Sequence, residues 1–277
     1  MRFSKKHIIG LIVILSICLH VFPAAAWNQL PLLTDSPRLL PAGQVQFDVG
    51  LQFLSRQNFP FLPFSAHPAR DVLSLPTLGL NFGFGKRVEL QLRYEVLFVE
   101  EEELRIKELW KSGDLAFFTK INILEEHRRL PGIGVKLGAK LPNTSDAYRV
   151  GTNETDLAFL ALFEKTFAAF TTTANLGLLI LSDPFRNVTQ DDLLSYGVAC
   201  TFPWKPNLTY TAEVAGQAGG ISHNERASAV LHLFFQNGAL TWNLATRVGL
   251  HKNSENWGVS GGVRWTFDWL KRWASDK

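Results

Sequence analysis

Hydrophobic and polar residues alternate along most of this chain in stretches of about ten residues, the length of a membrane-spanning β-strand. In residues 45–53, valine, leucine and phenylalanine occupy the odd positions, whereas glutamine, aspartate and glycine occupy the even ones. Successive side chains of a strand point to opposite faces, so this pattern predicts strands with one apolar and one polar face. It recurs at 88–96, 133–141, 240–250 and 257–267 and indicates an all-β protein.

The alternation predicts twelve strands in a single domain, because no linker or low-complexity stretch divides them. We expect these strands at residues 43–56, 72–84, 88–99, 113–123, 132–141, 156–166, 170–181, 194–202, 207–217, 228–236, 240–250 and 257–267. The connections alternate in length: 57–71, 100–112 and 142–155 are long, whereas most of those on the opposite side are tight turns. Outer-membrane barrels show this asymmetry, with short periplasmic turns and longer outside loops. Only residues 124–131 are longer than a periplasmic turn normally is.

A membrane location also explains why the sheet should close on itself. Hydrocarbon offers backbone groups no hydrogen-bond partners, so an open sheet edge there is prohibitively costly. We therefore predict a single closed antiparallel transmembrane β-barrel of about twelve strands. Aromatic residues near the strand ends suit the two interfacial girdles of such a barrel: Tyr94, Phe98, Trp204, Tyr210, Trp242, Trp257, Trp265 and Phe267. The alternative is a secreted β-sandwich, in which these aromatic residues form the core.

The first 26 residues read as a cleavable secretory signal peptide. Three basic residues precede a short apolar segment, and three alanines precede Trp27. An uncleaved membrane anchor is the alternative. We expect residues 27–42 to form a periplasmic segment or a plug in the barrel mouth, residues 43–267 to form the barrel, and residues 268–277 to form a C-terminal tail. The predicted localisation is the bacterial outer membrane.

Removal of the signal peptide changes the charge balance. The whole chain has 28 Lys and Arg against 25 Asp and Glu, and three of the basic residues belong to the signal peptide. The mature chain is therefore nearly neutral and has no basic stripe with interleaved aromatics, which argues against nucleic acid as a partner. Cys200 is its only cysteine, so it can form no internal disulfide and no thiolate metal cluster. We expect no cofactor and no metal.

Charged residues occupy positions that face the lumen in the predicted barrel. The candidates are Glu89, Arg93, Glu95, Asp114, Lys120, Lys136, Lys140, Asp156, Glu213, Arg247 and Arg264. One interpretation is that they line a polar path or a binding site. The other is that they form a salt-bridged filling that supports the wall, because small barrels commonly pack their interiors. Buried charges require partners under either interpretation.

Two outside loops carry residue types that hydrolases use. Ser222 with His223, or Ser254 with His251, could supply a nucleophile and a base if folding brought them within hydrogen-bond reach. Exposed loops are rich in such residues in any protein, so we expect no enzyme. In the same way, the mixed-sign run at 125–129 reads as a solvated turn rather than a metal or anion site.

Several short motifs between residues 113 and 167 resemble a recurrent bacterial pattern. They read Gly-Asp-Leu at 113–115, Lys at 120, Pro-Gly-Ile-Gly-Val at 131–135, Lys-Leu-Pro-Asn-Thr-Ser-Asp at 140–146, Gly-Thr-Asn-Glu-Thr-Asp at 151–156 and Glu-Lys-Thr-Phe at 164–167. This segment resembles the outer-membrane family named for a component of the phenol meta-degradation pathway, and related barrels. The resemblance implies a β-barrel that transports small, aromatic or apolar molecules, and it brings no catalytic motif. The chain departs from the family pattern at Asn143 and Thr144, where Thr-Gly is usual.

Together these observations predict an outer-membrane barrel that passes or binds small molecules. Its expected partners are outer-membrane lipid, lipopolysaccharide and a small-molecule solute. One alternative is a barrel without transport that serves as an envelope scaffold. The other is an outer-membrane lipid hydrolase.

Overall fold

The structure is a computed structural model, and it describes residues 33–58, 61, 70–101, 106–144, 152–185, 189–220 and 224–269. The predicted signal peptide, the loop residues Ser222 and His223, and residues 270–277 of the predicted tail lie outside the described residues. Within the described ranges, no helix is long and apolar enough to cross a membrane.

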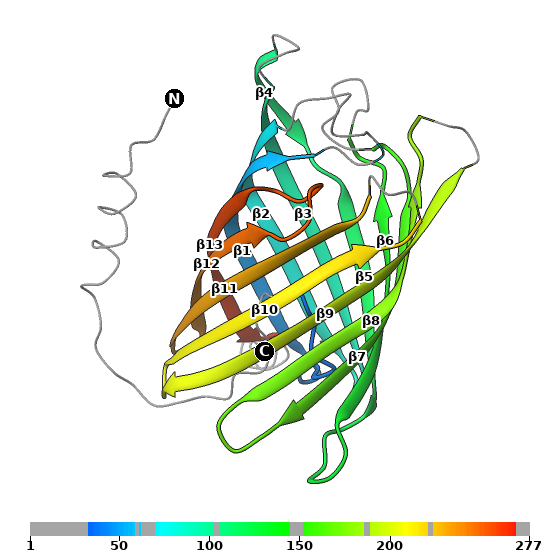
Figure 1. The fold of residues 1–277 in the computed structure, drawn as a ribbon. Helices are drawn as coiled ribbons and strands as arrows, with labels where there is room; N and C mark the ends of the chain where they lie inside the picture. Colours follow the sequence, from blue (N-terminus) through cyan, green and yellow to red (C-terminus); the bar gives the residue numbers. More distant parts are fainter. Residues whose placement is uncertain are drawn as a thin grey trace.

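The described chain folds into thirteen antiparallel strands. They are β1 (Gln44–Gln57), β2 (Arg70–Phe84), β3 (Val88–Glu101), β4 (Ile106–Ser112), β5 (Leu115–Leu124), β6 (Gly132–Leu141), β7 (Asp156–Thr166), β8 (Thr171–Ser182), β9 (Gln190–Lys205), β10 (Leu208–Ala218), β11 (Arg226–Asn237), β12 (Leu240–Gly249) and β13 (Trp257–Asp268). The first strand pairs with the last, from Gln44 opposite Asp268 to Ser55 opposite Trp257. This pairing closes the sheet into a barrel (Figure 1) and satisfies the backbone groups that an open edge would leave exposed.

Strands β4 and β5 share one place in the wall, so the closed barrel has twelve strand positions. Strand β3 pairs with β5 between Val88 and Arg93, and with β4 from Val96 onward. Gly113 lies at the break between β4 and β5, and its N–H donates to the carbonyl oxygen of Glu95 (2.8 Å). The predicted barrel is confirmed, but the expected loop at 100–112 is wrong in part. The ends of β3 and β4 pair as a hairpin there (Figure 1). The sequence predicted a loop because the acidic run at 100–103 obscures the apolar alternation.

The two ends of the barrel differ in the length of their connections, as the sequence predicts. At the short-turn end, the strands are joined by residues 85–87, 125–131, 167–170, 206–207 and 238–239. At the long-loop end, the connections span residues 58–69, 102–105, 142–155, 183–189, 219–225 and 250–256. Strand β1 begins and β13 ends at the short-turn end (Figure 1).

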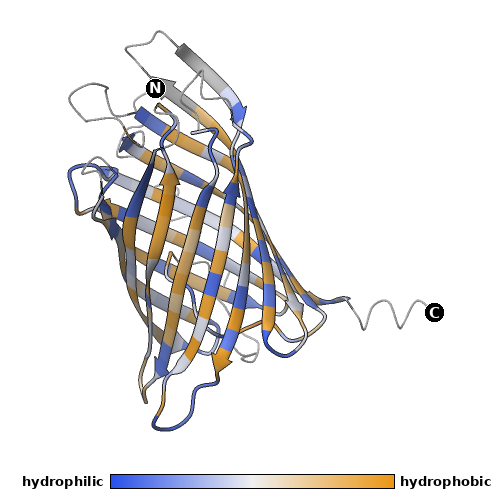
Figure 2. Cartoon of the chain, turned by 90° about the vertical axis from the view of Figure 1, so that its right-hand side faces the viewer, coloured by the Kyte–Doolittle hydropathy of each residue, from blue (hydrophilic) through white to orange (hydrophobic). Residues whose placement is uncertain are grey.

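The wall is apolar outside and polar inside, which is the reverse of a soluble protein. Large hydrophobic side chains such as Leu51 and Leu231 are exposed, whereas Glu89 and Lys120 are fully buried. Figure 2 shows hydrophobic and hydrophilic residues following one another along the strands, and mostly hydrophilic residues in the connections. This arrangement suits a barrel whose outer face contacts lipid.

Aromatic rings gather near both ends of the wall. At the short-turn end, Phe202 packs against Phe170 and Tyr210, with ring centroids 5.6 and 5.2 Å apart. At the long-loop end, the rings of Phe53 and Trp257 lie 5.3 Å apart. Two such belts are typical of barrels, at the levels where the wall meets lipid headgroups.

Candidate functional site

Residues 33–42, called the N-terminal segment below, lie inside the barrel. The backbone N–H of Leu33 donates to the Glu213 carboxylate (3.2 Å), and that of Leu40 donates to the Glu89 carboxylate (2.8 Å). Glu213 is on β10 and Glu89 is on β3, which are six of the twelve strand positions apart. The segment therefore crosses the lumen from one side of the wall to the other.

Asp35 is the main charge that the N-terminal segment brings into the lumen. Its carboxylate lies 3.2 Å from the Nζ of Lys120 and 2.9 Å from the Nζ of Lys136. Lys120 also lies 3.4 Å from Glu89, and the side chains of both residues are fully buried. Asn175 holds the Asp35 backbone: its Oδ1 accepts from the N–H (2.6 Å) and its Nδ2 donates to the carbonyl (2.7 Å). The segment and four strands are thus joined in one ion-paired cluster.

This environment keeps the Asp35 carboxylate ionised. Burial alone raises the pKa of Asp35, because it disfavours the charged form. The attraction of Lys120 and Lys136, together with their hydrogen bonds, outweighs burial and holds the pKa well below its usual range. The ion pairs therefore persist at neutral and mildly acidic pH.

A second set of contacts explains why residues 125–131 are longer than the other turns of their end. Arg38 forms ion pairs with Glu164 on β7 and with Glu126 in this turn, the second at 3.5 Å. Glu126 also accepts hydrogen bonds from Thr166, and Lys165 lies 3.2 Å from it. Burial raises the pKa of Glu126, but the hydrogen bonds from Thr166 and Lys165 and the charge of Lys165 together outweigh burial and lower the pKa below its usual value. The extra length lets the turn reach the N-terminal segment.

Glycines in the wall make room for the segment. A Cβ on Gly83 would lie 2.6 Å from the carbonyl oxygen of Leu40, and a Cβ on Gly197 would lie 2.5 Å from the Thr34 hydroxyl. Real Cβ atoms do not approach other atoms so closely. Glycine inside a strand often marks such a close approach of another backbone, so the wall is shaped around the segment.

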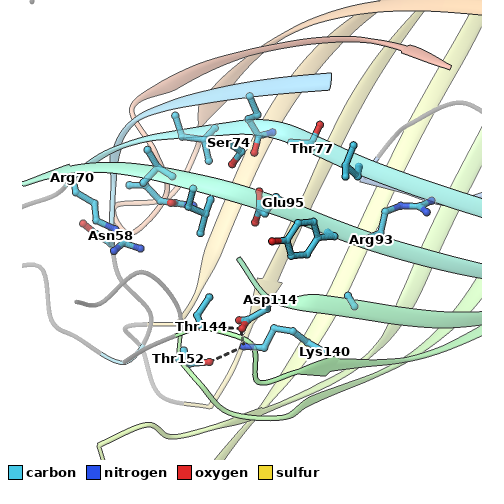
Figure 3. Close-up of a pocket in the computed structure, with 18 of the residues that line it drawn as sticks. Asn58, Arg70, Ser74, Thr77, Arg93, Glu95, Asp114, Lys140, Thr144 and Thr152 are labelled. Carbon is cyan, nitrogen blue, oxygen red and sulfur yellow. Dashed lines mark hydrogen bonds and ion pairs between the residues drawn. The ribbon is translucent and has the colours of Figure 1, made fainter. Parts of the chain in front are cut away.

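Toward the long-loop end the lumen is hollow. A cavity of about 470 Å³, called the outer chamber below, is lined from β1, β2, β3, β5, β6 and β11. Figure 3 shows Arg70, Arg93, Glu95 and Lys140 among its lining residues. The chamber is large enough for several water molecules or a small organic molecule.

One side of the outer chamber is fixed by an ion-paired group around Lys140. Its Nζ lies 3.2 Å from Asp114 and 2.6 Å from Asp156, and it donates to the Thr152 hydroxyl (2.6 Å). The Thr144 hydroxyl donates to Asp114 (2.9 Å) (Figure 3). These contacts tie Thr144 and Thr152 of the connection at 142–155 to Asp114, which precedes β5, and to Lys140 on β6. The two aspartates neutralise the charge of Lys140.

A second cavity of about 240 Å³ adjoins the outer chamber. Gln57 and Arg226 line both spaces, and Leu33 of the N-terminal segment lines the second. Arg247 also lines it, 3.6 Å from Glu255. The hollow part of the lumen therefore reaches from the long-loop end down to the N-terminal segment.

The structure places all eleven charged candidates from the sequence on the inner face of the wall. Four of them contact the N-terminal segment: Glu89, Lys120, Lys136 and Glu213. Four line the outer chamber: Arg93, Glu95, Asp114 and Lys140. Of the other three, Asp156 binds Lys140, Arg247 lines the second cavity, and Arg264 pairs with Asp48 (3.1 Å). His232 also faces the lumen, with its Nε2 3.0 Å from Glu213. The candidates thus separate into a filled half and a hollow half.

Sequence reasoning missed several charged residues of this interior, among them Asp35, Arg38, Arg70 and Arg226. Asp35 and Arg38 lie in a segment without alternation, so no pattern gave them a direction. Arg70 and Arg226 lie at the outer ends of β2 and β11, two residues before the predicted starts of these strands. Extending the alternation of 72–84 and 228–236 by two residues would have found both.

The rim residues considered for hydrolysis make other contacts. The Ser254 hydroxyl donates to the carbonyl oxygen of Ala227 (2.8 Å). The Nε2 of His251 lies 3.8 Å from Glu225. The Ser254 hydroxyl is therefore bound to backbone rather than to an imidazole, and the other candidate pair lies outside the described residues.

Comparison with known proteins agrees with this architecture. No family profile and no curated protein sequence matches the chain. Among solved structures, it is similar to an outer-membrane channel from Pseudomonas putida F1, at 14% identity over 82% of this chain and 97% of that chain, with a TM-score of 0.64. It is also similar to the NanC porin, at 8% identity over 79% of this chain and 98% of that chain, with a TM-score of 0.51. At these identities the likeness shows the fold, which is that of bacterial outer-membrane barrels.

Proposed function

We propose that this chain is an outer-membrane channel for small molecules, and that the N-terminal segment is a plug narrowing its short-turn end. The observation that carries the proposal is the division of the lumen. Ion pairs fill the half that holds the N-terminal segment, whereas the half toward the long loops contains two adjoining cavities. An interior that serves only to support the wall is expected to be close-packed, whereas about 470 Å³ of this lumen is open.

The predicted signal peptide and the apolar outer face support a location in the outer membrane. In this orientation the short-turn end faces the periplasm, and the long loops face outward toward lipopolysaccharide. Leu51, Leu231 and the other exposed aliphatic residues of the wall then contact lipid.

The position of the N-terminal segment in the chain supports its role as a plug. It precedes β1, so it can leave the lumen without breaking any strand pairing of the wall. It is held by ion pairs and hydrogen bonds rather than by covalent links. Removing it would therefore widen the path and leave the barrel closed.

Conductance in planar lipid bilayers tests this proposal. We expect the mature protein to give small single-channel steps, and a variant lacking residues 33–40 to give larger ones. A heat-modifiability gel shows that both proteins are folded, because folded barrels resist detergent until boiled. Folded protein that gives no conductance in either form would contradict the channel and favour the envelope scaffold.

The scaffold alternative is favoured by the ion pairs that cross the filled half of the lumen. It predicts that Lys136→Gln lowers stability and leaves permeation unchanged. A lipid hydrolase predicts lipid release that is lost in Ser222→Ala or Ser254→Ala. The bond between Ser254 and Ala227 gives that reading little support.

A further inference from the structure

The lining of the outer chamber has an apolar part and a polar part. Leu54 on β1 lies opposite Val72 on β2, and Leu97 on β3 lies diagonally from Val72, opposite Ser74. All three line the chamber and are more than nine-tenths buried. The chamber therefore has an apolar floor.

The rest of the lining is polar, and its basic side chains outnumber its acidic ones. Four basic residues, Arg70, Arg93, Lys140 and Arg226, and two acidic residues, Glu95 and Asp114, line the chamber. Lys140 is paired with Asp114 (3.2 Å) and with Asp156 (2.6 Å). The arginines are therefore the basic groups of the lining that could meet an anionic ligand.

Two hydrogen-bond donors in the lining of the chamber have no acceptor among the described residues. Arg226 donates through Nη2 to the carbonyl oxygen of Asn58 (2.8 Å). The Nε of Arg226 and the Nδ2 of Asn58 are buried and make no hydrogen bond within the described structure. Among the described residues, no carboxylate lies within ion-pair distance of Arg226, although Glu255 lies near enough to interact with its charge. Buried donors without acceptors are costly, and a ligand with acceptor oxygens would satisfy them.

We propose that the outer chamber binds a small organic carboxylate with an apolar body. The carboxylate accepts hydrogen bonds from Arg226 and Asn58, and the apolar part lies on Leu54, Val72 and Leu97. The proposal rests on the channel function proposed above, because it names the class of solute that the channel carries.

Ligand-observed saturation-transfer NMR on the folded full-length mature protein in detergent tests this site. The probes are benzoate, the neutral benzyl alcohol and the small anion acetate. We expect benzoate to bind and the other two to bind much more weakly, because benzyl alcohol lacks the carboxylate and acetate lacks the apolar ring. Equal binding of benzoate and benzyl alcohol, or of benzoate and acetate, would overturn the proposal, as would no binding of benzoate.

Two variants test the donors. Arg226→Gln removes the positive charge of the guanidinium. Asn58→Asp replaces the carboxamide, whose Nδ2 has no acceptor, by a carboxylate of nearly the same shape. We expect each to weaken benzoate binding about tenfold or more. The control is Lys205→Gln, which removes one charge from the exposed end of β9 at the opposite end of the barrel and should leave binding unchanged. Unchanged affinity in both folded variants would also overturn the proposal.

The two proposals fail in different measurements. If the barrel conducts but does not bind benzoate, the proposed carboxylate site is wrong and the proposed channel function remains. If the barrel binds benzoate but does not conduct, the proposed channel function is wrong and the proposed site remains.

Discussion

At the scale of single residues, Asp35 decides how the filled half of the lumen is held together. It lies 3.2 and 2.9 Å from two lysines on neighbouring strands, and it is the one carboxylate that contacts Lys136 among the described ion pairs. Lys120 keeps a second partner in Glu89 (3.4 Å). Loss of Asp35 would therefore leave Lys136 as an uncompensated charge inside the wall.

We expect Asp35→Asn to weaken the docking of the N-terminal segment by roughly 3–5 kcal/mol, the usual cost of removing one partner of a buried ion pair. Hydrogen exchange of residues 33–40, followed by mass spectrometry, should become faster, and single-channel steps should become larger. Asp192→Asn is the matched control, because Asp192 is exposed at the rim and its contact is with Gln190. Unchanged exchange in Asp35→Asn would show that the ion pairs do not hold the segment.

The low pKa of Asp35 also fixes the sign of a pH effect. Its contribution to docking is fully present above the unfolded pKa of about 3.9 and is lost only as the pH falls through the lower folded pKa. We expect the amides of residues 33–40 to stay protected at pH 4 as at pH 7, after correction for intrinsic exchange rates. Loss of protection between these two values would contradict this account of Asp35.

At the scale of elements, the fit between the N-terminal segment and the strands depends on small residues. Gly83 on β2 is the clearest case, because a Cβ there would lie 2.6 Å from the carbonyl oxygen of Leu40. Backbone atoms cannot rotate away as the end of a flexible side chain can. A methyl group at this position must displace the segment or the strand.

We expect Gly83→Ala to increase single-channel conductance and the exchange rate of residues 33–40, while the barrel remains heat-modifiable. Gly261→Ala is the control, since a Cβ there would meet its nearest neighbour, the carbonyl oxygen of Asn243, at 3.5 Å. If the two variants behave alike, the close approach at Gly83 has no influence on the segment.

At the scale of the whole molecule, the central question is which solvent surrounds the barrel. Leu231 lies near the middle of β11 and Leu250 just beyond the end of β12, and their exposed fractions are almost equal, 56% and 57%. In water the two positions would tolerate a charge equally. In a bilayer they lie at different depths.

We expect Leu231→Arg to lower the free energy of unfolding by about 2–4 kcal/mol, and Leu250→Arg to lower it by about 0–1 kcal/mol, because the cost of a charge on the lipid face depends on depth. Urea unfolding of the barrel in lipid vesicles measures both values. Equal effects would mean that lipid does not surround this wall.

The wall of the barrel could be predicted from the sequence because its pattern is local. Neighbouring residues of a strand point to opposite faces, as Phe47 and Asp48 do, so the direction of each side chain follows without knowledge of distant contacts. Closure was predicted from the cost of an open sheet edge in hydrocarbon. The alternation was obscured only where charge accumulates, at residues 100–103, and there the strand β4 was missed.

The contents of the barrel were decided by the tertiary structure. Asp35 meets Lys120, Lys136 and Asn175, which lie 85, 101 and 140 residues away along the chain. The N-terminal segment has no periodicity, so nothing in its sequence shows that it enters the lumen or which charges it meets. In the same way, Arg226 and Asn58 meet only because closure brings β11 and the end of β1 around one chamber. Alternation along a strand fixes which way a side chain points, whereas the partner across the lumen is fixed only when the sheet closes.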